Sequence, residues 1–505
     1  MAAPIGAVRS RLRLAPPTAI SVWVTRYVTS LGGVATIILL GWALSRLSLS
    51  ICLALVIGGI GLLAILRRPA IGLYALAFAI PFGSIREVSV AGASIGVSQA
   101  LAVVTIAAWL AQRLSYRRPI IVRSGITWAL AAYLGALLVA LWPAQDIALA
   151  AKEIAKWVEF AAIFALAAGD LGERETQGLV VALLLAGALQ GLLGAYQFFQ
   201  QTGPPGFVLL GRFMRAHGTF AQPNPYAGYL GLLLPLAYTT ALSTWRQAWP
   251  FSARRRGGRR RSAAGLIVWV LAVASALTMA AGLVMSWSRG ALLGALAGAA
   301  LVLLALGRRV WLALAVAALL ITPLSAGMPS LLPESLAERI TETVAYIGTS
   351  DVTAVEVNDA NFATIERLAH WRAAWLMFER APWLGVGTGQ YAAVYPSVAV
   401  PRWEDPLGHA HNVLLNVMAE GGLLALASYL GLMAAAVWAT WRAARGAHGS
   451  QRGVALGALG MMGHLLAHNM VDNLYVHEMY LLVAMLLGMA VTQWVQARPA
   501  VDSGE

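Results

Sequence analysis

Long apolar segments recur along the whole chain and restrict the folds that it can adopt. A segment of about 20 apolar residues can cross the ~30 Å hydrocarbon core of a bilayer as a helix. Only 11% of the 505 residues are charged and 59% are hydrophobic, whereas soluble proteins carry roughly a quarter charged residues. We therefore predict an all-α polytopic membrane protein of about 12–14 transmembrane helices. The apolar windows fall near residues 30–46, 49–66, 70–84, 98–112, 125–143, 153–169, 177–199, 225–244, 264–285, 290–306, 310–327, 411–440, 453–470 and 474–493.

The distribution of charge and the single cysteine argue against a nucleic-acid-binding protein and against a disulfide-bonded one. The net charge is +14, but the arginines cluster in short loops between apolar windows. This placement fits topology signals and anionic lipid head groups better than nucleic acid. Cys52 lies within an apolar window, so no intrachain disulfide is expected. We also expect no cleavable signal peptide, because the arginine-bearing N-terminal segment lacks a short apolar region with a cleavage site.

The loop arginines predict the orientation in the membrane. With a cytoplasmic N-terminus, most arginine-rich loops share the cytoplasmic side, and two longer segments, about 200–224 and 328–410, lie on the opposite side. We expect a cytoplasmic segment (1–29), N-terminal transmembrane helices (30–199), transmembrane helices with arginine motifs (200–327), a large extracytoplasmic loop (328–410), C-terminal transmembrane helices (411–493) and a cytoplasmic tail (494–505).

The large loop has structure of its own. Pro333–Val344 and Thr364–Arg380 both show the apolar spacing of amphipathic helices. In the second, the apolar positions are Leu368, Trp371, Trp375 and Phe378. Proline and three glycines then interrupt the helical pattern from Pro382 onward. We expect a helical cap over the extracytoplasmic face of the bundle.

A first polar cluster precedes a predicted transmembrane helix. Pro225 suits the first turn of that helix. One interpretation is interfacial anchoring, in which the arginines reach the lipid head groups. The other is phosphate binding, because a guanidinium offers a bidentate fork to phosphate oxygens. The residues concerned are Arg212, Arg215, His217 and Asn224.

A second cluster, Ser286-Trp287-Ser288-Arg289-Gly290, joins two apolar windows with almost no loop. Arg289 is costly at such a position unless it pairs or faces a wet cavity. It either ends a helix at the interface or is a directed guanidinium, and the short serine-flanked connection favours the second interpretation.

A third cluster lies where the large loop enters an apolar window. It contains His409, His411 and Asn412, with Glu420 about two and a half turns further on. Histidine can hold or move a proton near neutral pH, and a carboxylate at this depth needs a partner. A polar helix cap is the simpler interpretation of one histidine but explains the whole set poorly. Zinc is another possibility, although a single H-x-H is a weak metal signal.

A fourth set, His464, His468 and Asp472, recurs at intervals of one helical turn. The three side chains are therefore expected to share one helix face. The predicted topology places the first three polar clusters on the extracytoplasmic face and seven of the eight histidines on the outer half, which favours a functional site.

Taken in order, these motifs resemble the O-antigen ligase/polymerase superfamily of bacterial membrane glycosyltransferases. No single motif is highly specific, but their ordered combination over about residues 200–480 is. The matching motifs are Arg215-x-x-Gly218-Thr219-Phe220-x-x-Pro223-Asn224-x-x-Ala227, Ser288-Arg289-Gly290, Gly385-x-Gly387, His411-Asn412-x-x-Leu415 and Glu420-x-Gly422.

The resemblance implies a GT-C-like enzyme of the bacterial cytoplasmic (inner) membrane with its site facing the periplasm or exterior. The implied donor is a polyprenyl-diphosphate-linked glycan. The implied acceptor is lipid A–core of lipopolysaccharide, another lipid-linked glycan or a protein. Neither a metal nor another cofactor is implied. A polymerase that extends lipid-linked repeat units remains an alternative, as does a transporter or flippase of an anionic lipid-linked substrate, although the paired repeats common in transporters are not evident.

The resemblance and the residues together suggest individual roles. Arg215 and Arg289 would bind the donor diphosphate, with Arg212 assisting, and the first cluster would contribute His217 and Asn224 to substrate binding. His411 would be the general base for the acceptor hydroxyl. His409, Asn412 and Glu420 would orient it or the acceptor, and Asp472 would hold a guanidinium or an imidazole.

Overall fold

The computed structural model describes residues 46–83, 87–90, 93–209, 211–248, 263–310, 355–358 and 361–496, together with Val34, Trp42 and Leu312. The chain divides into two compact units, Met1–Ala64 and Ile65–Glu505. Helix α2 (Leu49–Arg67) begins in the first unit. All of the site residues considered below belong to the second unit.

The apolar windows that fall within the described residues are helices. In addition to α2 these are α3 (Ala70–Phe82), α4 (Val97–Ser115), α5 (Gly125–Val139), α6 (Ile147–Asp170), α7 (Glu173–Gln200), α8 (Pro223–Ala248), α9 (Ala263–Met285), α10 (Arg289–Leu306), α15 (Val413–Gly446), α16 (Gly449–His468) and α17 (Met479–Gln496). Most of the windows at 30–46 and 310–327, and the predicted helix at Pro333–Val344, lie outside the described residues.

Length and composition suit several of these helices to a bilayer. Among the described residues, six helices are long and apolar enough to cross a membrane, namely α2, α4, α7, α9, α10 and α15. Large apolar side chains also point outward, as at Leu277 (66% exposed), Leu296 (71%) and Trp438 (63%). Such surfaces are stable against lipid but rare on soluble monomers. The protein is therefore an all-α polytopic membrane protein, as predicted.

Several helix ends differ from the apolar windows because capping groups decide them. Helix α6 begins at Ile147, ahead of the window at 153, since Asp146 Oδ1 accepts hydrogen bonds from the Ala148 and Leu149 N–H groups. Helix α17 begins at Met479 rather than near 474. The intervening α16–α17 loop (residues 469–478) carries Asp472. Pro225 does lie in the first turn of α8, as expected.

Two short antiparallel hairpins interrupt the helical pattern. Strands β1 (Glu87–Val90) and β2 (Ala93–Gly96) precede α4, and β3 (Val208–Leu209) pairs with β4 (Phe213–Met214) ahead of α8. The second hairpin determines how the chain that carries Arg215 approaches the bundle, because the Arg215 N–H donates to the Phe207 carbonyl at 3.0 Å.

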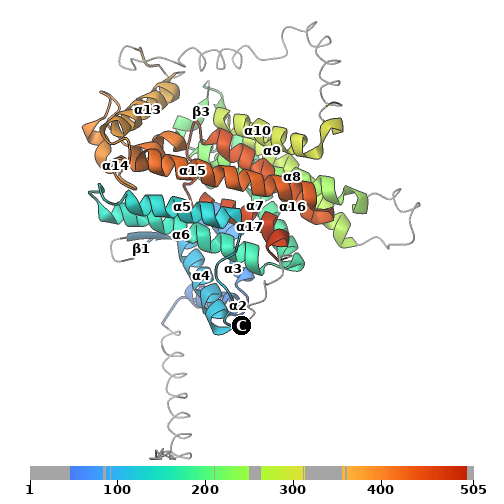
Figure 1. Cartoon of the computed structure of the whole chain (residues 1–505). Coiled ribbons are helices and arrows are strands. Elements are labelled where there is room, and N and C mark those ends of the chain that lie inside the picture. Colours follow the sequence, from blue (N-terminus) through green and yellow to red (C-terminus); the bar gives the residue numbers. More distant parts are fainter. Residues whose placement is uncertain are drawn as a thin grey trace, which may run out of the picture. The chain divides into compact units, whose positions relative to one another are not determined.

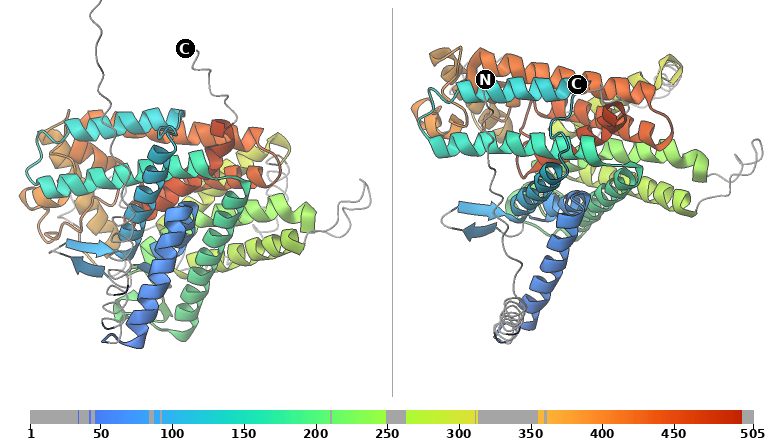
Figure 2. Two further views of the ribbon diagram at one scale, coloured as in Figure 1. Left: turned by 90° about the horizontal axis from the view of Figure 1, so that it is seen from below. Right: turned by 60° about the horizontal axis from the view of Figure 1, so that its bottom comes forward.

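The helices of the second unit pack mostly with partners that are distant in sequence. Helix α16 packs against α8 and α10, α9 against α7 and α8, α17 against α6, and α15 against α5 (Figure 1). Figure 2 shows α5, α6 and α15 running side by side. Aromatic side chains fill the space between them, with the Tyr133 and Trp157 rings edge-to-face at 4.8 Å and the Tyr429 and Tyr475 hydroxyls 2.9 Å apart.

Helix α13 (Phe362–Arg380) and the single turn α14 (Tyr391–Val394) form a small helical layer near the N-terminal end of α15 (Figure 1). Two 3-10 turns, Pro205–Phe207 and Tyr395–Ser397, complete the described elements. The prediction of a helix at Thr364–Arg380 is confirmed. Its most buried face is formed by Ile365, Ala369, Ala373 and Met377, whereas Trp375 of the predicted apolar face is 41% exposed.

The segment that carries Gly385-x-Gly387 crosses helix α15 at Glu420-x-Gly422, and backbone hydrogen bonds join the two at this crossing. At Gly422 the backbone adopts φ 61° and ψ −160°, which interrupts α15 and is a conformation essentially limited to glycine. The interruption leaves helix carbonyls to be satisfied. Accordingly, Val386 N–H donates to the Ala419 carbonyl (2.9 Å) and Gly387 N–H to the Glu420 carbonyl (3.0 Å).

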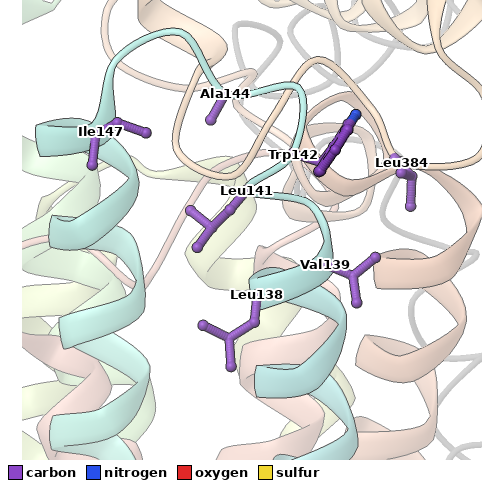
Figure 3. Close-up of a pocket in the computed structure, with 7 residues that line it drawn as sticks. All are labelled: Leu138, Val139, Leu141, Trp142, Ala144, Ile147 and Leu384. Atoms are coloured by element: carbon purple, nitrogen blue, oxygen red, sulfur yellow. The ribbon is translucent and has the colours of Figure 1, made fainter.

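A shallow apolar groove lies beside this crossing, at the connection between α5 and α6 (Figure 3). Trp142 is 91% exposed there and lies beside Leu384 in the lining of the groove. No titratable side chain lines the groove, so it offers a contact for apolar chains rather than a place for acid–base chemistry. Its lining residues are Leu138, Val139, Leu141, Trp142, Ala144, Ile147 and Leu384.

Candidate active site

Arg215 is held against the connection between α9 and α10. Its Nε donates to the Ser286 carbonyl (2.8 Å) and one terminal nitrogen to Asn224 Oδ1 (3.1 Å). The next residue repeats the contact, since Ala216 N–H donates to the Met285 carbonyl at 3.0 Å. The first and second polar clusters of the sequence therefore lie together in the structure. Asn224 is a hydrogen-bond partner of Arg215 there.

Arg289 begins α10 and faces the helical layer. A terminal nitrogen of its guanidinium lies 3.4 Å from Thr364 Oγ1 of α13. The tight connection before it is stabilised by Ser286, whose Oγ donates to the Leu283 carbonyl and accepts from the Ser288 N–H. Arg289 is thus a directed guanidinium between α10 and α13, which supports the second interpretation of this cluster.

His411 lies immediately before α15, in a left-handed conformation with φ 50°. Such a conformation is unfavourable for a residue with a Cβ, and its neighbours stabilise it. Asn412 caps α15 by accepting from the Leu415 N–H (3.1 Å) and donates to the Met470 carbonyl (3.0 Å). Val413 N–H also donates to the Asn469 carbonyl (2.9 Å). Asn412 therefore joins the start of α15 to the α16–α17 loop.

This joining places His411 beside Asp472. Their Nδ1 and Oδ1 atoms are 3.3 Å apart, and Asn473 N–H donates to the same carboxylate oxygen at 2.9 Å. Although burial alone would raise it, the pKa of Asp472 lies well below its usual range because of the hydrogen bond with His411 and the charge of Arg367. An ionised Asp472 favours the tautomer in which Nδ1 of His411 carries the proton.

The other ring nitrogen of His411, Nε2, is buried and has no hydrogen-bond partner among the described residues. Buried polar atoms in folded proteins are almost always paired, so an unpaired one suggests a ligand or reaction partner. The rings of His409 and His370 lie edge-on to the His411 ring, with centroids at 4.4 Å and 5.6 Å.

The two flanking histidines are kept neutral. Burial lowers the pKa of His409 to about 3 and that of His370 to about 4, and the nearby His411 adds to both effects. His409 Nδ1 accepts a hydrogen bond from the His411 N–H at 3.1 Å. His370 Nδ1 is 3.1 Å from the Tyr391 hydroxyl. Neither histidine is therefore poised to carry a proton at neutral pH.

The fourth polar set is arranged differently from the expectation of a shared helix face. His464 and His468 do lie one turn apart in α16, with His464 Nε2 and His468 Nδ1 at 3.3 Å. However, α16 ends at His468 and Asp472 follows in the loop. The two imidazoles fit because glycines face them. A Cβ on Gly290 would lie 3.1 Å from His468 Nε2, which accounts for the glycine after Arg289.

The remaining predicted site residues make other contacts. Arg212 is exposed, with its guanidinium 5.2 Å from the Phe213 ring centroid. His217 packs toward α7, where its Nε2 is 3.3 Å from Gln197 Nε2. Glu420 is buried and accepts the Tyr391 N–H at 3.0 Å, which provides the partner that a carboxylate at this depth requires. Its visible role is to hold the chain that follows Gly385-x-Gly387.

Sequence reasoning missed the contribution of α13 to the site. Arg367 lies 3.9 Å from Asp472 through Nη2 and Oδ2. Trp371 donates from Nε1 to the His411 carbonyl at 3.3 Å. Both residues lie within the predicted amphipathic helix, but nothing in its spacing indicates a contact with residues that follow much later in the chain.

Three donor residues, with His411 among them, lie close enough together to be considered as cation ligands. Among the described residues, ligand atoms of His409, His411 and Asp472 lie within 4.8 Å of one another. The donor set resembles a two-histidine, one-carboxylate centre. However, Arg367 lies beside the only carboxylate, and its positive charge opposes a divalent cation there. The arrangement suits an imidazole–carboxylate pair better than a metal centre.

Comparison with known proteins agrees with the geometry. Residues 274–430 match the family model described as O-antigen ligase. The match includes Arg289, α13, His411 and the crossing at Gly422. No curated protein matches the chain. Residues 274–430 are therefore similar to an O-antigen ligase domain, in agreement with the resemblance of the motifs to the O-antigen ligase/polymerase superfamily.

Proposed function

We propose that the protein transfers a glycan from a polyprenyl-diphosphate donor to an acceptor hydroxyl on the extracytoplasmic face of the bacterial cytoplasmic membrane. The observation that carries the proposal is the pairing of His411 with Asp472, in which the buried Nε2 has no hydrogen-bond partner among the described residues. An imidazole whose other nitrogen is held by a carboxylate is suited to accept a proton.

The proposed reaction uses His411 as the base and Asp472 as its partner. The acceptor oxygen attacks the anomeric carbon of the donor sugar, and its proton passes to His411 Nε2. The bond between the anomeric carbon and the phosphate oxygen breaks, and polyprenyl diphosphate leaves with the electron pair. A direct displacement of this kind inverts the anomeric configuration. Asp472 stabilises the imidazolium that forms, as a carboxylate does in other histidine-dependent enzymes.

Arg215 and Arg289 are the proposed ligands of the diphosphate. Guanidinium groups bind phosphate through paired hydrogen bonds and stabilise charge that develops on the leaving group. Their contacts with Ser286, Asn224 and Thr364 hold both side chains in the site before substrate arrives. Because arginines supply positive charge to the leaving group, we propose that transfer needs no divalent metal.

Access to His411 requires a small rearrangement. Nε2 is shielded from solvent in this conformation, and the rings of His409 and His370 flank it. The acceptor hydroxyl can reach Nε2 only when a covering side chain moves. We propose that His409 moves, since it precedes the left-handed residue His411 in a loop, whereas His370 is anchored within α13.

Purified protein, a synthetic polyprenyl-diphosphate glycan and a lipid-linked acceptor, assayed in EDTA, test the proposal. We expect transfer by the wild type and a loss of about 100-fold or more in His411→Ala and Arg289→Ala. His448→Ala and Arg372→Ala are matched controls, because both side chains are exposed and His448 lies at the far end of α16. Robust activity of His411→Ala would refute the proposed base.

The product distinguishes ligase from polymerase. Transfer of the glycan to a different acceptor lipid would support the ligase that we propose, whereas a ladder of longer lipid-linked chains would show a polymerase. Activity that EDTA abolishes and a divalent ion restores would contradict the metal-free mechanism.

A further inference from the structure

Helix α13 contacts three separate parts of the site through one stripe of side chains. Thr364 lies 3.4 Å from Arg289, Arg367 pairs with Asp472, and Trp371 donates to the His411 carbonyl. These positions are spaced by three and four residues, so they lie on one face of the helix. The helix therefore connects the proposed diphosphate ligand Arg289 to the proposed base.

We propose that Arg367 is the positioning residue of this stripe, acting on His411 through Asp472. The inference rests on the proposed function of His411 as the base. It adds a residue from the extracytoplasmic layer to a site otherwise formed by the ends of transmembrane helices.

The geometry of Arg367 supports a positioning role. Its Nε donates to the Val471 carbonyl and its Nη1 to the Ala363 carbonyl, both at 2.9 Å. Two such bonds fix the plane of a guanidinium. The third nitrogen, Nη2, then faces Asp472 Oδ2 at 3.9 Å. Arg367 thus holds the backbone and the side chain of the same short segment.

The two oxygens of Asp472 are divided between two partners. Oδ2 faces Arg367 and Oδ1 faces His411. A carboxylate placed between a guanidinium and an imidazole cannot rotate without losing one of them. Arg367 therefore fixes the direction in which Oδ1 points, and with it the tautomer and orientation of the His411 ring.

Arg367 also helps to keep the carboxylate of Asp472 charged. Together with the hydrogen bond to His411, the positive charge of Arg367 holds the pKa of Asp472 below its usual range. The ionised carboxylate is the form that orients the imidazole. A residue that acts in this way should affect kcat, whereas an additional ligand of the diphosphate should affect KM for the donor.

The test compares Arg367→Met and Arg367→Lys with Arg372→Met, an exposed arginine on the same helix. We expect kcat to fall at least ~10-fold in Arg367→Met, with little change in KM for the donor. Lysine keeps the positive charge but should restore only part of kcat, because it cannot reproduce the planar bonds to Val471 and Ala363. Arg372→Met should behave as the wild type.

A double-variant cycle isolates the path through Asp472. If Arg367 acts through this carboxylate, Arg367→Met should have little further effect on kcat in an Asp472→Asn background. Full additivity, or a rise in KM for the donor with an unchanged kcat, would overturn the proposal. Unfolding temperatures of all variants show whether a loss of activity reflects loss of fold.

The outcomes separate this inference from the function on which it rests. If His411→Ala is inactive while Arg367→Met retains the kcat of the wild type, only the role of Arg367 fails. If His411→Ala is active, the proposed function itself fails.

Discussion

Asp472 Oδ1 lies 3.3 Å from Nδ1 of His411 although 61 residues separate them in the chain. The contact exists because the α16–α17 loop is hydrogen-bonded to the start of α15 at Asn412 and Val413. It brings a carboxylate from one loop to an imidazole at the start of another helix, and the second imidazole nitrogen, Nε2, has no hydrogen-bond partner among the described residues.

Replacing Asp472 by asparagine tests this pair. Asparagine keeps the size of the side chain but removes the negative charge that stabilises the imidazolium and selects the tautomer. We expect kcat of Asp472→Asn to fall about 100-fold or more, with a much smaller change in KM for the donor. Initial rates at saturating acceptor provide the measurement. A wild-type rate would show that His411 does not depend on Asp472.

The stability of the protein should also depend on Asp472 at acidic pH. Its pKa is depressed in the folded state, so the stabilisation is fully present above the ordinary aspartate pKa of about 3.9 and is lost as pH falls through the folded pKa. The difference in unfolding temperature between the wild type and Asp472→Asn should therefore shrink below about pH 4. A difference that grows on acidification would contradict the assignment.

The burial of His409 should make the stability of the protein sensitive to acid over a higher pH range. Burial lowers its pKa to about 3 in the folded protein, whereas an unfolded histidine titrates near 6.5. The unfolded state therefore binds more protons in this window, and stability falls as pH drops from about 6.5 toward 3. His409→Asn keeps an acceptor for the His411 N–H but cannot titrate, so its unfolding temperature should fall less steeply over that range. An unchanged slope would show that His409 is not buried as a neutral ring.

Gly422 should not tolerate a side chain. A Cβ there would overlap the Trp383 backbone, at a φ of 61°. We expect Gly422→Ala to destabilise the protein by about 1–3 kcal/mol or more, and to lower activity by displacing the chain that Glu420 holds. Gly431→Ala is the matched control on α15, since nothing lies within 4 Å of its Cβ position. It should stabilise the helix by up to about 1 kcal/mol. Equal effects of the two variants on thermal unfolding would contradict the crossing described above.

The packing of α8 against α16 predicts that a substitution at His464 can offset the effect of a substitution at Gly231. A Cβ on Gly231 would overlap the ring of His464, so Gly231→Ala should lower the unfolding temperature. In a His464→Ala background the space is open, and the same substitution should have little effect. The coupling between the two sites should be about 0.5–3 kcal/mol, measured as a double-mutant cycle in detergent. Additive effects would show that the two residues do not pack together.

Much of the fold follows from the sequence alone, because one physical requirement dominates it. Each helix that crosses a bilayer must be apolar over about 20 residues, and this pattern locates α7, α9 and α10 closely. Helix ends such as those at Asp146 and Met479 depend on capping and loop contacts, which hydropathy does not report. The sequence also indicates the polar residues of the site, since Arg289, His411 and Glu420 are costly at their depth unless they have partners.

Only the tertiary structure decided how those residues combine. It showed that Arg215 and Ser286 belong to one site element, that Asn412 caps α15 and joins it to another loop, and that Glu420 is bonded to the backbone at Tyr391. It also brought Arg367 of α13 next to Asp472, which lies much later in the chain. The physical reason is that periodicity and hydropathy report the local environment of a residue. Contacts between distant segments depend on which helices pack together, and that is decided by the shapes of many side chains at once.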